Sequence, residues 1–569
     1  MTFTAATADQ VLAIRVNAGI EELAGHDRFA AASPDMVEAI VEGIGQFAAG
    51  EFAPLNRKGD LEGARLDNGK VTLPDGFAEA YQAFVEQGWN AISGEAGFGG
   101  QGLPFTLAAN VLENLGSANM AFSLLPMLTV GAIESLSHHG SESQKATYLA
   151  RLISGEWSGT MNLTEPQAGS DVGALRTTAV PAGDGKWHIK GTKIFITWGE
   201  HDLAGNIVHL VLARTPGAPA GTRGISLFIV PKYHVNADGS LGARNDLRCV
   251  SLEHKLGIMA SPTCVMSFGD NDQCLGEMIG AENEGLKAMF TMMNSARINV
   301  GNQGVQIAER ALQQARAYAR DRIQSARAGS PDKNPVAIVE HPDVRRMLLR
   351  MRSLTEGARA LLYYTAGMVD RGALGIAGSQ ARADCLVPMI KAWGTDVGCE
   401  VASLGVQIHG GMGFIEETGA AQHYRDARIA PIYEGTNGIQ AADLVTRKLG
   451  YEQGGVLAAL FAEIVADCED APQIRALAAD CAEVAGWMSQ TASLDDRLAG
   501  SVAFCTMASV AVAGWQLQRQ ARDGAGGEAK RVVARYFAEH IASEARGLKP
   551  AATAGAGLLY ALSAEELAG

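Results

Sequence analysis

The pattern of apolar and polar positions changes twice along the chain, and these changes divide it into helical and strand-rich stretches. Up to about residue 156, apolar residues recur every three or four positions, as in Met36, Ile40 and Ile44. This spacing places them on one face of a helix, which a hydrophobic core can bury. We therefore predict an N-terminal helical domain over residues 1–156.

A strand-like pattern follows over residues 157–281. Short runs rich in β-branched and aromatic residues are separated by glycine, proline and aspartate, which favour turns. The clearest runs are 187–189, 207–212, 225–230 and 264–268. Several strands in succession, without helices between them, predict a central antiparallel, β-barrel-like domain.

Helical spacing returns after residue 281 and continues to the end of the chain. Leu286, Met289 and Met293 mark one face of a helix. We predict a helical bundle over residues 282–450 and a C-terminal helical extension over residues 451–569. The predicted fold class is therefore α+β, with a helical domain, a β-domain, a helical bundle and an extension.

One stretch of the extension must be assessed as a possible membrane span. Residues 498–518 carry no charge and are long enough to span a bilayer. However, Gly500, Ser501 and Gln516 make this stretch only modestly hydrophobic. A buried helix of a bundle accounts for it better, so we predict no membrane span.

Composition narrows the classes of function. The 569 residues carry a formal net charge of −15, which disfavours nonspecific binding to nucleic acid or to anionic membranes. The eight cysteines stand singly, without a C-x-x-C pair, so we expect neither a disulfide framework nor a metal site. No signal peptide is recognisable near the N-terminus, and a cytoplasmic location is expected.

The main candidate for chemistry is the stretch from Ala430 to Gln440, which reads A-P-I-Y-E-G-T-N-G-I-Q. Pro431 ends the preceding element, and the residues from Asn437 onward predict the start of a helix. Between them lies Glu434, beside Gly435, whose backbone freedom lets a ligand approach the main chain. Such a carboxylate is a candidate general base, although a loop carboxylate without a catalytic role is the commoner case.

A second polar stretch, M-N-L-T-E-P-Q-A-G-S-D over residues 161–171, opens the strand-rich domain. Its hydroxyls and exposed backbone N–H groups suit the polar edge of a ligand. Together with I-Y-E-G-T-N-G-I-Q, it resembles the acyl-CoA dehydrogenase family of flavoproteins. The length beyond residue 450 and the stretch E-H-P-D-V-R-R-M-L are similar to a long bacterial branch of that family. The resemblance covers essentially the whole chain.

This resemblance implies an activity and a set of partners. A glutamate in the family removes the α-proton of an acyl-CoA thioester while FAD takes the β-hydrogen as hydride, and Glu434 matches that glutamate. The resemblance implies FAD as cofactor and an electron-transferring flavoprotein as acceptor. It implies a small acyl-CoA as substrate, with 3-methylmercaptopropionyl-CoA among the candidates. It also implies a homodimer, because the family completes each flavin site with residues of a neighbouring subunit.

The family's flavin contacts carry over to individual positions. Phe195 and Thr197, in the stretch F-I-T-W, match residues packed along the flavin ring. Arg322 matches an arginine that binds the flavin pyrophosphate. The remaining matched flavin contacts are Met161, Leu163, Thr164, Ser170, Gln407, Gly410, Gly411, Thr436 and Asn437.

Three positions match contacts to the substrate. Ser170 matches a contact to the thioester arm as well as to the flavin. Arg297 matches an arginine near the adenine end of CoA, and Gly435 lies beside the matched base.

Two alternatives share these motifs. An acyl-CoA oxidase would use the same base with oxygen as the electron acceptor, and no residue of the sequence separates it from a dehydrogenase. A flavin-bearing binding protein that protects DNA would have the same fold. The acidic net charge and the intact E-G-T segment oppose that second alternative.

Overall fold

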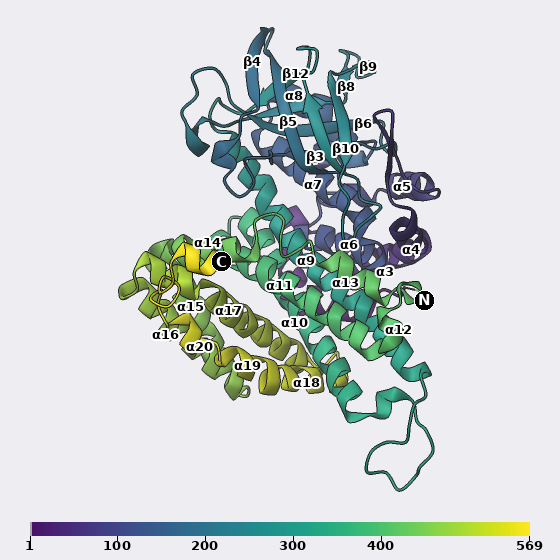
Figure 1. Cartoon of the computed structure of the whole chain (residues 1–569), viewed down its shortest axis with the longest axis vertical. Helices are drawn as coiled ribbons and strands as arrows, with labels where there is room; N and C mark the ends of the chain where they lie inside the picture. Colours follow the sequence, from purple (N-terminus) through teal and green to yellow (C-terminus); the bar gives the residue numbers. More distant parts are fainter. Residues whose placement is uncertain (1–2) are drawn as a thin grey trace. The chain divides into compact units, whose positions relative to one another are not determined.

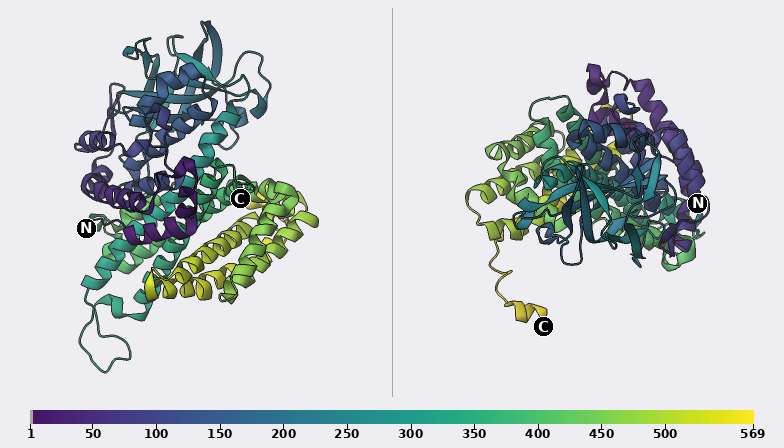
Figure 2. Two further views of the ribbon diagram at one scale, coloured as in Figure 1. Left: turned by 180° about the vertical axis from the view of Figure 1, so that it is seen from behind. Right: turned by 90° about the horizontal axis from the view of Figure 1, so that it is seen from above.

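The computed structural model describes residues 3–569, and Figures 1 and 2 show the chain from three directions. The residues form two compact units. One unit runs to Gly45 and resumes from Arg297 to Gly569, and the other is Gln46–Ala296. The first unit is thus built from two separate stretches of sequence, and the second from one.

The unit Gln46–Ala296 begins with helices, as the sequence predicted. Helix α6 (Phe105–Ala118) is buried along its whole length, and α7 (Met120–His139) packs against strand β3 (Trp157–Asn162). Gly159 permits this packing, because a Cβ atom there would lie 2.4 Å from the Ala132 Cβ. The other helices are α4 (Ala53–Glu62), α5 (Phe77–Glu86) and α8 (Glu142–Ser154).

A short hairpin interrupts these helices and was not predicted from the sequence. Strands β1 (Arg65–Asp67) and β2 (Lys70–Thr72) pair in antiparallel fashion. Asn68 and Gly69 join them, both with positive φ, at 47° and 77°. These angles match the tight turns that fit the twist of two paired strands.

The main sheet of this unit has eight strands in the order β10-β11-β5-β12-β7-β6-β3, with β4 beside β5. Among the described strands, only β3 and β6 pair in parallel, with Trp157 opposite Asn206. A parallel pair needs a long crossover, which residues 163–205 supply. The remaining strands are β4 (Thr178–Gly183), β5 (Lys186–Thr197), β6 (Asn206–Ala213), β7 (Ser226–Pro231), β8 (Tyr233–Val235), β9 (Leu241–Arg244), β10 (Leu247–Leu252), β11 (Thr263–Phe268) and β12 (Leu275–Ile279).

This sheet confirms the predicted β-domain, including the four runs expected as strands. The sheet is not a closed barrel, because β10 and β3 stand at the two ends of the strand order. Its antiparallel character is also incomplete, since the β3–β6 pair is parallel. Strands β8 and β9 form a separate two-stranded hairpin that does not belong to the main sheet.

The other unit is a bundle of long helices. Helix α9 (Gly285–Asp321) belongs to it from Arg297 onward and lies close to α11 (Ser379–His409). A Cβ atom at Gly304 would lie 1.8 Å from the carbonyl oxygen of Gly394, so glycine is required for this approach. Helix α10 (Pro342–Ala373) pairs with α11 and begins with proline in its first turn, where the missing N–H is tolerated. Shorter helices follow: α12 (Gly411–Phe414), α13 (Ala420–Ala427) and α14 (Asn437–Thr446).

The C-terminal extension packs onto the same bundle. Its longest helix, α17 (Leu494–Asp523), contains the uncharged stretch and contacts α10, α11 and α14. By length and composition α17 and α7 are long enough to cross a membrane, but both are mostly buried within the protein. The prediction of a buried bundle helix is therefore confirmed. The other helices are α15 (Gly455–Asp467), α16 (Pro472–Gln490), α18 (Gly527–Tyr536), α19 (Ser543–Arg546), α20 (Lys549–Ala552) and α21 (Ala564–Ala568).

The N-terminal segment completes this unit. Helix α1 (Thr7–Ala13) contacts α10, and the π-helical turn Ile14–Ala18 contacts α10 and α17. Asn17 donates from its side-chain amide to the carbonyl oxygen of Gln516 at 3.0 Å, and Arg15 pairs with Asp523 at 2.6 Å. The extension therefore packs on the helices of its own chain. Helices α2 (Ile20–Ala24) and α3 (Pro34–Phe47) follow along the chain.

Candidate active site

Glu434 lies in a short loop before α14, and its backbone is strained. Its φ is 55°, and that of Gly435 is 82°. A positive φ is uncommon for a residue with a Cβ atom and persists only where the surroundings impose it. The loop is closed by a hydrogen bond from the Asn437 N–H to the Pro431 carbonyl oxygen at 3.0 Å. The structure thus fixes the orientation of the predicted base.

Two side chains hold the main chain at Glu434. Its carbonyl oxygen accepts hydrogen bonds from Arg297 Nε at 3.4 Å and from Gln440 Nε2 at 3.2 Å. The neighbouring Tyr433 donates its hydroxyl to the side-chain oxygen of Gln303. Arg297 and Gln303 both lie on α9, so this helix supports the loop from one side.

Helix α14 is anchored to α11 through its first residue, Asn437. The Asn437 Oδ1 accepts from Lys391 Nζ at 3.0 Å, and its Nδ2 donates to Asp396 Oδ1 at 2.8 Å. Thr436 caps the helix by accepting the Ile439 N–H at 3.2 Å. Thr436 and Asn437 therefore shape the loop that carries Glu434.

Charge and burial act in opposite directions on Glu434. Burial raises the pKa of its carboxyl group, and the cations Arg297 and Lys391 counteract part of that rise. Burial also lowers the pKa of Lys391 to about 8. The result is a carboxylate of increased basicity that two neighbouring cations help to keep ionised. Glu434 as a whole is half-buried.

Lys391 was not recognised from the sequence. It is fully buried, and no carboxylate of the described residues lies within ion-pair distance of it. The sequence did contain a sign of this burial, because Lys391 is the one charged residue in the otherwise uncharged run from Leu386 to Trp393. Buried lysines without a carboxylate partner are rare in protein interiors and concentrate where charge has a function.

The second predicted group lies at β3 and β5 in the unit Gln46–Ala296. The Thr164 carbonyl oxygen accepts the Ile194 N–H at 2.9 Å, and Lys193 Nζ donates to the Leu163 carbonyl oxygen at 3.0 Å. The neighbouring Met161 is buried in β3, whereas Ser170 is exposed in the loop beyond. The predicted contacts at 161–164 are thus held next to β5.

The end of β5 presents the other two predicted residues of this group. Phe195 has a φ of 59°, and 58% of it is exposed, so its ring is available to a flat ligand. Thr197 accepts a hydrogen bond at its carbonyl oxygen from Thr160 Oγ1 at 2.7 Å. The nearby Trp198 is fully buried beside Phe122 and fills the core.

Glu165 supports this loop from inside, a role that the sequence did not reveal. It is buried and pairs with Lys193 at 2.8 Å. It also accepts the Arg176 N–H at 2.7 Å and the Thr177 hydroxyl at 2.6 Å. Burial alone would raise the pKa of Glu165, but Lys193 and these hydrogen bonds lower it to about 2. Glu165, within the stretch M-N-L-T-E-P-Q, is therefore a buried anion with a structural role.

Arg322 and the stretch Gln407 to Gly411 stand at neighbouring helix ends in the other unit. The ring of Tyr318 near the end of α9 stacks on His409 at the end of α11, with 4.4 Å between centroids. Arg322 is exposed and donates to Gln324 Oε1 at 3.0 Å. Gln407, Gly410 and Gly411 are exposed as well. These residues are free to meet a ligand or a second copy of the chain.

The structure thus assembles the predicted residues in three groups. Glu434, Gly435, Thr436, Asn437 and Arg297 form one, and Arg322 with the Gln407 to Gly411 stretch forms another, both in the same unit. The third group lies at β3 and β5 of the other unit. The described residues contain no cluster of three or more His, Cys, Asp or Glu side chains that could hold a metal ion.

Comparison with protein-family models matches four consecutive stretches. They are described as the acyl-CoA dehydrogenase N-terminal domain at residues 34–156, its middle domain at 160–271 and its C-terminal domain at 283–449. A fourth model, described as acetyl-CoA dehydrogenase C-terminal like, matches residues 460–563. The extension is therefore also a recognised part of such proteins.

Individual relatives extend over nearly the whole chain. The 3-methylmercaptopropionyl-CoA dehydrogenase of Ruegeria pomeroyi is 52% identical over 535 residues, covering 91% of this chain and 90% of the relative. The broad-specificity linear acyl-CoA dehydrogenase FadE5 of Mycobacterium tuberculosis is 33% identical over 578 residues, covering 94% of each.

A solved structure shows the same fold. An acyl-CoA dehydrogenase from Bacillus anthracis, complexed with FAD, has a TM-score of 0.75 at 23% identity and covers 94% of this chain and 89% of that one. The architecture, the matched domains and the relatives agree with the motifs around Thr164 and Glu434. This chain belongs to the acyl-CoA dehydrogenase family.

Proposed function

We propose that the chain is an FAD-dependent oxidoreductase that introduces an α,β double bond into a small acyl-CoA thioester, with Glu434 as the base. The observation that carries the proposal is the state of Glu434. It is a carboxylate fixed in strained backbone, with its pKa raised by burial and two cations nearby. A carboxylate in this state suits the removal of a weakly acidic proton at working pH.

The α-proton of a thioester is so weakly acidic that a carboxylate exposed to water cannot readily remove it. Raising the pKa of Glu434 brings its basicity closer to what the reaction needs. The Glu434 carboxylate takes the α-proton, and the electron pair of the Cα–H bond forms the new double bond as the β-hydrogen leaves. FAD, when bound, accepts that β-hydrogen together with its electron pair. The Glu434 N–H, in the family's manner, would stabilise negative charge on the thioester oxygen.

The residues present suit FAD. Phe195 offers an exposed ring at the end of β5, beside the polar loop at Thr164. Arg322 offers an exposed guanidinium, whose planar fork of donors matches a pyrophosphate. Gln407, Gly410 and Gly411 offer exposed polar backbone at a helix end. We assign the flavin ring to the first set of residues and the pyrophosphate and adenosine to the others.

The substrate we propose is 3-methylmercaptopropionyl-CoA or another small acyl-CoA. The relative from Ruegeria pomeroyi, with 52% identity over nearly the full length, supports this choice.

We further propose an electron-transferring flavoprotein as the electron acceptor and the cytoplasm as the location. The isolated cysteines, which suit a reducing compartment, support that location.

A homodimer is part of the proposal. Immediately after Gly411, the apolar residues Met412, Phe414 and Ile415 are 50%, 85% and 45% exposed. Contiguous exposed apolar side chains are typical of contacts between proteins. In the family, the neighbouring Gln407 to Gly411 segment serves a second subunit, so a second copy of this chain is the expected partner.

A substrate panel tests the proposed function. The purified protein is mixed with acyl-CoAs of increasing chain length and with 3-methylmercaptopropionyl-CoA, in the presence of an artificial electron acceptor. We expect the highest kcat/KM with the small thioesters and little peroxide in the presence of oxygen. A strong preference for long chains would contradict the substrate assignment, and rapid peroxide formation would identify an oxidase.

A further inference from the structure

A cavity of about 910 Å³ lies in the unit that contains Glu434, between the N-terminal segment, α9, α10 and α18. It does not include Glu434 or any residue matched to the flavin. Arg297, which contacts the Glu434 loop, precedes Arg316 of the cavity by roughly 19 residues on α9, or about 28 Å along the helix axis. The cavity is therefore separate from the catalytic group. Its wall carries five arginines: Arg310, Arg316, Arg320, Arg345 and Arg352.

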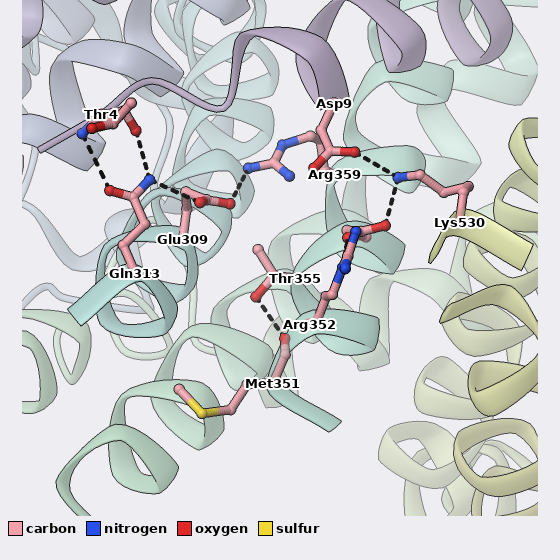
Figure 3. Close-up of polar contacts among 10 residues, drawn as sticks. Thr4, Asp9, Glu309, Gln313, Met351, Arg352, Thr355, Arg359 and Lys530 are labelled. Atoms are coloured by element: carbon pink, nitrogen blue, oxygen red, sulfur yellow. Dashed lines mark hydrogen bonds and ion pairs between the residues drawn. The ribbon is translucent and has the colours of Figure 1, made fainter. Parts of the chain in front are cut away.

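The two acidic residues of the wall do not balance these arginines. Glu309 accepts a hydrogen bond from Arg359 at 2.7 Å, and Asp9 pairs with Lys530 at 2.9 Å (Figure 3). Neither Arg359 nor Lys530 lines the cavity. Both carboxylates are thus paired with cations outside the wall. Arg345 and Arg352 of the wall pair in turn with Glu340 and Glu356, which also lie outside it.

Two of these arginines lack any partner in the part of the chain that the structure describes. Arg316 and Arg320 form neither a hydrogen bond nor an ion pair with a described residue. Arg316 is half-buried and Arg320 is exposed, and burial lowers the pKa of Arg316. The carboxylates of Glu309, Glu356 and Asp9 offset part of this effect, although none of them forms an ion pair with Arg316. A partly buried cation without a direct ion pair is unfavourable, so an anion in the cavity would remove the remaining cost.

The remaining wall indicates what kind of anion fits. Val339, Leu348 and Leu349 give it an apolar side. The volume lies in the range of pockets for ligands much larger than a single phosphate. Several guanidinium forks match a ligand with more than one phosphate, because each fork pairs with phosphate oxygens.

We propose that this cavity is a second ligand site, which binds a nucleoside polyphosphate. Arg316 and Arg320 bind the phosphates, and the apolar side contacts the base. The same chemistry belongs to a free nucleotide such as ADP and to the nucleotide end of CoA. The proposal of this site does not depend on the proposed dehydrogenase activity, because no catalytic residue lines the cavity.

Calorimetric titration of the full-length, FAD-saturated protein tests this site. The probes are ADP, ATP, free CoA and inorganic pyrophosphate. We expect saturable binding of ADP or CoA that weakens about 10-fold in each of the variants Arg316→Gln and Arg320→Gln, because each loses a charge-assisted contact. The matched control is Arg346→Gln on α10, an exposed arginine that pairs with Asp343 and does not line the cavity. It should change affinity less than 2-fold.

The probes also distinguish the two sources of the ligand. Tighter binding of ADP than of CoA at the arginine-dependent site identifies a free nucleotide, and the reverse order identifies the nucleotide end of CoA. Pyrophosphate binding as tightly as both would overturn the nucleotide assignment. The site itself is overturned if no probe binds up to millimolar concentration, or if Arg346→Gln weakens binding as much as Arg316→Gln. Thermal melting of each variant shows that the protein remains folded.

Discussion

Glu434 combines a strained backbone, a raised pKa and two neighbouring cations, and these properties have separate consequences. The strained backbone sets the direction in which the side chain leaves the main chain. Burial increases its basicity, and Arg297 and Lys391 limit that increase. A base tuned in this way is sensitive both to its own replacement and to changes in the cations around it.

Replacing Glu434 with glutamine should abolish most of the activity and leave the fold intact. The amide has nearly the same shape but cannot accept the proton, so turnover should fall by at least about 10²-fold. Steady-state kcat and the flavin absorbance of the purified variant provide the measurement, and bound FAD should be unchanged. Glu417→Gln, an exposed acid 17 residues before Glu434, is the control. Near-normal turnover in Glu434→Gln would exclude the base assignment.

Replacing Lys391 with methionine should change the pH dependence of the reaction. The variant removes a cation that lowers the pKa of Glu434, so that pKa should rise. Because the base acts in its ionised form, the acidic limb of the kcat/KM profile should move to higher pH. Lys333→Met, in the exposed loop before α10, removes the same charge far from the base in sequence and should leave the profile unchanged. An unshifted profile in Lys391→Met would show that this cation does not act on Glu434.

Strand β5 shows how one element serves both the core and a binding loop. Lys193 points inward to Glu165 and the Leu163 carbonyl oxygen, whereas Lys190 of the same strand is exposed and pairs with Asp272 at 2.6 Å. The buried pair orders the polar loop at 161–171, and the exposed pair lies in solvent. Burial should therefore decide how much each pair contributes to stability.

Lys193→Met should destabilise the protein by about 3–5 kcal/mol, because it leaves the buried Glu165 carboxylate unpaired. Lys190→Met should cost less than about 1 kcal/mol. Chemical denaturation of both variants gives the comparison. In the unmodified protein, the pKa of Glu165 is lowered to about 2. The ionised Glu165 therefore contributes fully above the ordinary carboxyl pKa, and this contribution is lost as pH falls toward 2. On the alkaline side, burial lowers the pKa of Lys193 to about 8, so the ion pair also weakens as pH rises through that value. Equal losses in the two variants would contradict this account.

The elements differ in how far the sequence predicted them. The strands around Ile207 and Ile225 have short apolar runs rich in β-branched residues and bounded by turn residues, and they were predicted correctly. The hairpin β1–β2 was missed although Asn68-Gly69 is a strong turn signal. Its strands are three residues long and mostly polar, so no alternation was visible. The parallel pairing of β3 with β6 depends on a crossover, which local patterns do not record.

At the scale of the whole molecule, the extension covers helices that would otherwise be exposed. Helix α17 packs on α10, α11 and α14 of its own chain, and α14 begins at the residue that anchors the Glu434 loop. The residues around Glu434, including Gln440, belong to one contiguous motif and were predictable, but Lys391 joins them only through the packing of α11 against α14. Such a partner follows from tertiary structure rather than from spacing.

Truncation after Gly450 should therefore expose the apolar faces of α10, α11 and α14 and lead to aggregation or loss of flavin. Light scattering and the flavin absorbance of the truncated protein measure both effects. The full-length chain should behave as a homodimer in the same experiment. A truncated protein that stays soluble, dimeric and active would contradict this role, and a tetrameric full-length chain would contradict the proposed assembly.

The contact of Asn17 with Gln516 has a consequence for synthesis on the ribosome. At about 5–20 residues per second, roughly 25 to 100 s separate the translation of these two partners. The stretch 46–296 is complete in sequence before α17 exists, so it is able to fold first. During that interval, the first helices can pack on α10, which is translated well before α17. They therefore lack this partner until residues 342–373 emerge, and they complete their packing only when α17 follows.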